Sequence, residues 1–157
     1  MIPVAITSYT LVKFFHVLLA IVAVGFNASY GIWIARASRE REHELHVLRG
    51  IKVLDDRFAN PAYGLLLLTG LLMVRFGHWS VLHTFWLGTA LIIYVVMGLT
   101  AATMYTPTLK RQIALLEAGQ GATPEYGMLA TRGTVVGLIL AVLVITIVFL
   151  MVVKPTL

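Results

Sequence analysis

The chain has 157 residues, of which 59% are hydrophobic and only 12% charged. A soluble domain carries roughly 25% charged residues, spread around its surface. The composition therefore excludes an ordinary soluble domain and a disordered chain, and it indicates a small, single-domain integral membrane protein in a lipid bilayer. Because the chain has no cysteine, disulfides, thiolate metal sites and cysteine nucleophiles are excluded as well.

Four continuous apolar stretches predict an all-α fold, a bundle of four transmembrane helices. These spans cover residues of about 8–35, 60–76, 84–106 and 134–153. A helix needs ~20 apolar residues to cross a ~30 Å hydrocarbon core, so the second span is short. We expect it to begin inside the preceding loop or to lie in a thinned bilayer. The first run is too long for a cleavable signal peptide, so we expect it to remain as a helix.

The basic residues predict the orientation of the bundle. Six lie within residues 36–57 and three within 110–132, which together hold nine of the twelve. Because lysine-rich and arginine-rich loops stay in the cytoplasm, loops 36–59 and 107–133 are expected there. Both termini are then expected on the outer, periplasmic side of a bacterial inner membrane. The net charge of +5 is partly this topology signal, and no nucleic-acid partner is expected.

The two cytoplasmic loops are predicted to contain helices. Within residues 42–58 apolar side chains recur every three or four positions, which is typical of one face of an amphipathic helix. This helix is expected either to extend a membrane helix or to lie along the membrane surface. A second helix is predicted over residues 108–118, with Thr108 as its N-cap and Gly119 as its end.

The first and third spans carry stripes of polar and small residues that are expected to face the other helices. Small residues let membrane helices approach closely, and glycines of the second and fourth spans fit the same role. The first stripe is Tyr9, Lys13, His16, Ala20, Ala23, Asn27 and Tyr30; the third-span stripe is Trp86, Ala90, Tyr94, Gly98, Ala102 and Tyr105; the other small residues are Gly64, Gly70, Gly133 and Gly137.

His16 is the most informative residue of the first stripe, because burying an imidazole in hydrocarbon is costly unless it is hydrogen-bonded or ligated. One interpretation is a neutral histidine bonded to a partner such as Tyr94 or Thr69. The other is a functional group, either an axial ligand of a haem iron or another metal, or a proton-transfer group.

Further candidates lie on the outer side. Lys13, Arg75 and Lys154 have no carboxylate on that face, so they are candidates to hold haem propionates or to reach lipid phosphates. Asn27 and Tyr94 are further cofactor-binding candidates. Imidazole and thioether ligands suit copper, and the residues that offer them on this side are His78, His83, Met73 and Met151.

Several segments resemble a superfamily of small bacterial membrane proteins. They are YTLVKFFHVLLAIVAVG around His16, RFANPAYGLLLLTGLLMV at the second span, the pair Trp86–Leu87, and the ending MVVKP. The superfamily includes a domain-of-unknown-function family of predicted integral membrane proteins and the membrane domain of copper-resistance D-like proteins. HemJ-type protoporphyrinogen oxidases look like more distant relatives. In those proteins the first-helix histidine ligates haem b, and the resemblance implies this role for His16.

Two departures weigh against protoporphyrinogen oxidase activity. HemJ-type proteins carry a tryptophan where this chain has Ala23, and a functional lysine where it has Ala90. The leading hypothesis is therefore a membrane protein that binds haem b through His16 for electron transfer or haem-related redox chemistry, which as an enzyme would be an oxidoreductase. One alternative is a non-catalytic accessory subunit of a larger respiratory-type membrane complex, and the other is copper handling at the outer face. The expected partners are other membrane subunits or further copies of the chain in a homo-oligomer.

Overall fold

The computed structural model describes residues 7–81 and 83–156, and these contain helices and no strand. Four long helices are apolar enough to cross a membrane, which confirms the all-helical membrane fold. The first is α1 (Ser8–Ala37). The second joins α2 (Arg41–Leu54), the π-helical turn η1 (Asp55–Ala59) and α3 (Asn60–Phe76). The third joins α4 (Phe85–Thr100), the π-helical η2 (Ala101–Tyr105) and α5 (Thr106–Glu117); the fourth is α6 (Pro124–Val153).

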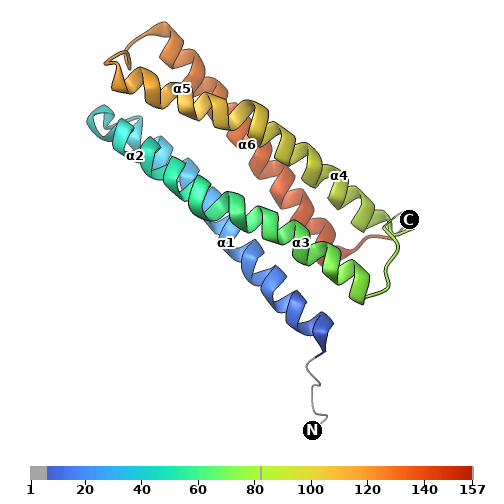
Figure 1. The fold of residues 1–157 in the computed structure, drawn as a ribbon. Coiled ribbons are helices and arrows are strands. Elements are labelled where there is room, and N and C mark those ends of the chain that lie inside the picture. Colours follow the sequence, from blue (N-terminus) through green and yellow to red (C-terminus); the bar gives the residue numbers. More distant parts are fainter. Residues whose placement is uncertain (1–6, 82, 157) are drawn as a thin grey trace.

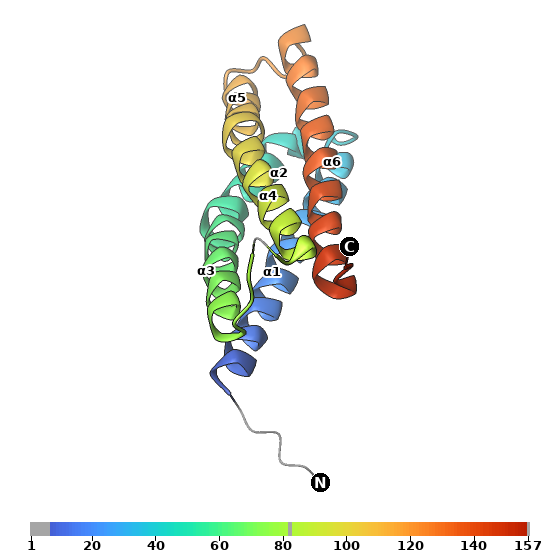
Figure 2. The same ribbon diagram turned by 90° about the vertical axis from the view of Figure 1, so that its right-hand side faces the viewer.

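The four long helices form two hairpins, as Figures 1 and 2 show. Helix α1 packs along α2 and α3, while α6 packs along α4 and α5. The hairpins meet where α2 contacts α5 and α1 contacts α6, whereas the backbones of α3 and α4 are not packed together in the described chain. The start of α1, the connection between α3 and α4, and the end of α6 lie at one end of the bundle (Figure 1).

The segments expected as cytoplasmic loops are mostly helical continuations of the membrane helices. Within 36–59 only a short turn separates α1 from α2, and within 107–133 only residues 118–123 lie outside α5 and α6. The reason is a buried cluster in which Leu48 and Ile51 of α2 and Leu109 of α5 pack with Tyr30 of α1. The amphipathic helix thus extends a membrane helix, and α6 begins ten residues before the expected start of its span.

The ends of these helices agree with the sequence prediction at Gly119 and differ from it at Thr108. Gly119 ends α5 as predicted, with a φ of +71° that glycine adopts without strain. Thr108 is not an N-cap, because it lies inside a continuous helix, is buried, and donates its hydroxyl proton to the carbonyl of Met104. Thr7 and Thr123 are the caps observed, each accepting a bond from a backbone N–H three residues on.

The stripe on α1 faces the bundle as predicted from His16 to Tyr30, with Ala23 and Tyr30 fully buried. The stripe predicted for the third span is confirmed where α4 begins, because Trp86 and Ala90 are buried. Further along it is wrong, because Gly98 and, in η2, Ala102 are exposed. That stripe advanced in steps of four residues, and each such step drifts ~40° around a helix of 3.6 residues per turn. Met97 occupies the buried face instead.

The glycines divide into those at helix contacts and those in open space. A side chain at Gly133 would lie 3.4 Å from the Gln112 side chain, and one at Gly137 would lie 3.9 Å from the Tyr105 ring, so both support the packing of α6 on η2 and α5. Gly64 has no such neighbour within 4 Å, so its expected packing role is wrong.

Candidate functional site

His16 lies on α1 about two turns after its start and is half-buried against α3. Its Nδ1 atom lies 2.8 Å from the hydroxyl oxygen of Thr69. This is one of the two partners that the sequence suggested. The bond crosses from one apolar helix to the next, so it satisfies one imidazole nitrogen inside the bundle.

The surroundings of Thr69 favour one tautomer of the imidazole. The Thr69 hydroxyl donates to the carbonyl of Leu65 at 2.8 Å, with the carbonyl of Leu66 at 3.2 Å. A hydroxyl has one proton, and carbonyls only accept, so the oxygen of Thr69 is left to accept a bond from His16. In the tautomer that donates from Nδ1 to Thr69, Nε2 keeps a free lone pair, as a metal-ligating imidazole requires.

Gly70 lies close to the same edge of the ring, at Cε1 and Nδ1. A Cβ atom at Gly70 would lie 3.4 Å from Cε1 and 3.9 Å from Nδ1 of His16. The ring therefore packs directly against the backbone of α3. Thr69 fixes the ring by a hydrogen bond and Gly70 fixes it by close packing, so the orientation of the imidazole is set by two neighbouring residues of one helix.

Asn27 and Tyr94 come together at a second polar level, around Tyr63. The Asn27 side-chain amide donates to the Tyr63 hydroxyl at 2.9 Å and to the carbonyl of Ala23 at 3.0 Å. The Tyr94 hydroxyl donates to the carbonyl of Tyr63 and so bridges α4 to α3. His16 precedes Asn27 by eleven residues, about 16 Å along the helix, so this level is separate from the His16 site.

The three cations named as propionate candidates do not share one position. Lys13 and Arg75 are exposed on different helices. Lys154 lies with its Nζ 5.0 Å from the ring centre of Trp79 and 5.5 Å from that of Trp86. The two indoles stand edge to face at 4.9 Å. This arrangement places the Lys154 ammonium over two aromatic faces.

The residues named for copper lie around the same end of the bundle, where α3 and α6 end. His78 and His83 are exposed, and His78 has a φ of 53°. Met151 packs against the buried cluster of Trp86, Ala90 and Leu150. Across residues 7–81 and 83–156, no three His, Asp or Glu side chains gather as they would around a metal ion.

The sequence reading missed a buried polar pair at the other end of the bundle. Asp55 is 7% exposed and accepts a 3.4 Å bond from Asn60. Tyr30 is 3% exposed, and its hydroxyl has no partner among the described residues. The signal was present, because Asp55 follows buried Leu48 and Ile51 at helical spacing and so shares their face.

The chain matches one known protein family. A family model described as "predicted integral membrane protein" (DUF2269) matches residues 10–155, which include His16, Thr69 and Gly70. No curated protein and no solved structure matches the chain.

Proposed function

The chain belongs to the "predicted integral membrane protein" (DUF2269) family, and from this premise we propose that it binds haem b through Nε2 of His16 for redox chemistry within the membrane. The observation that carries the proposal is the bond between Nδ1 of His16 and Thr69. Histidines that ligate metals almost always donate their other ring N–H to a fixed acceptor, which sets the tautomer and the ring orientation.

The residues that fit a haem at this site are the candidate iron ligand and the two residues that hold its ring. His16 offers the axial nitrogen, while Thr69 and Gly70 hold its ring. Lys13, one turn before His16 on the same helix, and Arg75 on α3 are the exposed cations that remain for propionates, because Lys154 already lies over two indoles. When bound, the haem would supply a one-electron redox centre.

Two open hollows lie on the described surface, and His16 lines neither of them. A haem bound at this nitrogen would therefore lie outside both of these hollows. We infer that another chain, either a second copy or a different membrane subunit, would complete the α1–α3 face around a bound haem. Haem binding is thus proposed to depend on assembly with that second chain.

The test is the haem content of the full chain purified in detergent after haem supplementation during expression. Wild type is expected to retain haem, and His16→Ala is expected to lose it while remaining folded by circular dichroism. His43→Ala is the matched control, because His43 is exposed on α2 and far from α1–α3 packing at Thr69. Equal haem content in His16→Ala and wild type would contradict the proposal.

A second candidate is a non-catalytic subunit of a larger membrane complex. It is favoured by the internal pairing of polar groups in the spans, since His16 bonds to Thr69 while Asn27 and Tyr94 both bond to Tyr63. Such pairs hold helices together in lipid without further chemistry. A subunit would co-purify with a larger complex at fixed stoichiometry and would show no haem, and His16→Ala would leave that complex intact. Isolation only as a monomer would exclude it.

The location and orientation of the bundle belong to the same proposal. The charge-rich segments 36–57 and 110–132 lie at the end where α2 meets α5, opposite the start of α1 and the end of α6. By the positive-inside rule that end faces the cytoplasm, in the inner membrane of a bacterium. His16 and its proposed haem then lie in the outer half of the membrane. Copper handling by the outer histidines gains no support from their positions.

A further inference from the structure

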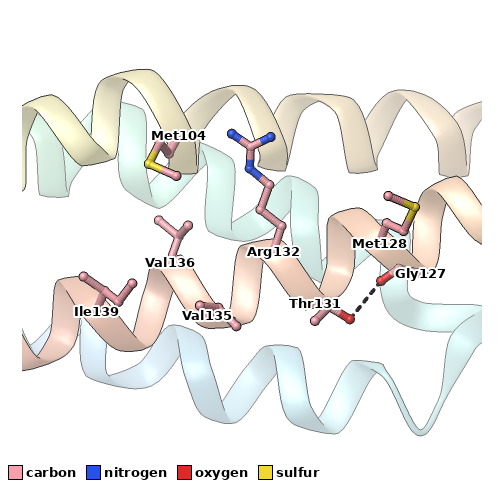
Figure 3. A pocket seen from close by; sticks show the side chains of 8 residues that line it. All are labelled: Met104, Gly127, Met128, Thr131, Arg132, Val135, Val136 and Ile139. Atoms are coloured by element: carbon pink, nitrogen blue, oxygen red, sulfur yellow. Dashed lines mark hydrogen bonds between the residues drawn. The ribbon is translucent and has the colours of Figure 1, made fainter.

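An open hollow of about 620 Å³ lies where η2 faces the inner part of α6 (Figure 3). Its walls are mostly apolar, with Met104 coming from η2, and Met128, Val135 and Ile139 coming from α6. In Figure 3 the Arg132 side chain rises from α6 between Met104 and Met128. The hollow therefore combines a long apolar floor with one cation at its middle.

Arg132 is the one charged side chain that lines this hollow, and it is exposed. It takes part in none of the three ion pairs found in residues 7–81 and 83–156. Glu125, two turns earlier on α6, bonds instead to Arg111 at 2.8–2.9 Å. The neighbouring Thr131 hydroxyl donates to the carbonyl of Gly127. The positive charge of Arg132 is thus left for an anion from outside the chain.

The sequence of α6 fixes the depth of Arg132 in the bilayer. Residues 133–153 carry no charge, and at 1.5 Å per residue they extend about 32 Å, which matches a hydrocarbon core of ~30 Å. Arg132 therefore lies at the level of the lipid headgroups. Val135 and Ile139 lie deeper, one and two turns into the hydrocarbon. From Arg132 towards the hydrocarbon, the wall of the hollow is therefore apolar.

We propose that this hollow binds one anionic phospholipid, with its phosphate against Arg132 and an acyl chain along Met104, Val135 and Ile139. Guanidinium groups match phosphate geometry well, and the apolar wall gives the chain a surface that a free phosphate would not use. A second copy of this protein is a poorer occupant, because covering Arg132 with an apolar helix would bury a cation without a partner.

The experiment is native mass spectrometry of the full chain, released from detergent and titrated with phosphatidylglycerol or with zwitterionic phosphatidylcholine. Wild type is expected to retain one phosphatidylglycerol in preference to phosphatidylcholine. Arg132→Gln is expected to weaken phosphatidylglycerol binding about fivefold, the effect of one basic side chain at an anionic lipid surface. Gly127→Leu is expected to weaken the binding of both lipids. A Cβ at Gly127 meets no atom within 4 Å, so a leucine side chain would fill the part of the hollow on the headgroup side of Arg132.

The matched control is Arg57→Gln. Arg57 is exposed, belongs to none of the three ion pairs, and adjoins the apolar segment of α3 in the other hairpin, away from the hollow. It is expected to leave the preference unchanged. An equal loss in Arg57→Gln and Arg132→Gln would show a general charge effect and would overturn the proposal. So would full competition by inorganic phosphate, or a dimer mass in wild type that Gly127→Leu abolishes.

Discussion

The imidazole of His16 on α1 and the hydroxyl of Thr69 on α3 lie 2.8 Å apart, and Gly70 lets the two helices close around that bond. The pair explains how an ionisable side chain is accommodated in an apolar segment. It also leaves the second imidazole nitrogen free for a ligand. The same three residues thus serve both helix packing and the proposed haem ligation, and variants can separate the two roles.

Gly70→Val should disturb the His16 ring directly. Its Cβ would lie 3.4 Å from Cε1 of His16, and the added methyl groups would reach further, so the ring or α3 must move. Overpacking of this kind costs about 1–3 kcal/mol of unfolding free energy. Thermal unfolding in detergent is the measurement. Gly64→Val on the same helix is the control, since its Cβ meets nothing within 4 Å. Equal destabilisation of the two variants would show that the contact with His16 is unimportant.

Thr69→Val should weaken haem binding more than it weakens the fold. It keeps the shape of the side chain and removes the acceptor for Nδ1 of His16. Loss of such a supporting bond lowers metal affinity about 10-fold to 100-fold. Titration of the haem-free protein with haem, followed by absorbance, measures the change. Thr69→Ser keeps the hydroxyl and should restore affinity, and an identical affinity in Thr69→Val would remove Thr69 from the site.

Lys154 should stabilise the end of the bundle at which α6 ends, through its contacts with two indoles. Its ammonium lies 5.0 Å and 5.5 Å from the ring centres of Trp79 and Trp86, which joins the end of α6 to the start of α4. Such contacts contribute about 0.5–1 kcal/mol at exposed sites. Unfolding followed by tryptophan emission should show Lys154→Gln less stable and Lys154→Arg close to wild type. Arg and Gln variants of equal stability would speak against the cation–π contact.

The orientation can be tested because the chain has no cysteine of its own. Glu40→Cys lies in the turn between α1 and α2, and Ser80→Cys lies in the connection between α3 and α4. A membrane-impermeant maleimide should label the Ser80 variant in intact bacterial spheroplasts, and the Glu40 variant only after the membrane is opened. The reverse pattern would invert the bundle and place His16 in the cytoplasmic half.

Much of the fold follows from the sequence, because an apolar run of this length has few stable forms other than a membrane helix. The amphipathic pattern around Leu48 and Ile51 also foretold a helix. It did not decide between a helix that extends α3 and one that lies along the membrane surface, since the choice depends on the distant partners Tyr30 and Leu109, which are buried together with Leu48 and Ile51. Periodicity describes one helix at a time, whereas continuity depends on what packs beside it.

The candidate site was foreseen in the same partial way. His16 and Thr69 were named as partners because an imidazole in lipid needs one. The pairing of Asn27 and Tyr94 through Tyr63 was not foreseen, since it depends on how α1, α3 and α4 rotate against one another. The burial of Asp55 was not predicted, although this residue follows Ile51 at helical spacing and shares its face.

The most direct test of the central proposal is the reduced-minus-oxidised absorption spectrum of the detergent-purified, haem-supplemented protein beside that of His16→Ala at equal concentration. Ligation by His16 predicts a Soret shift and an α-band in wild type, both absent from the folded His16→Ala variant. A wild-type protein without either band, or a His16→Ala variant that keeps both, would contradict haem ligation by this residue.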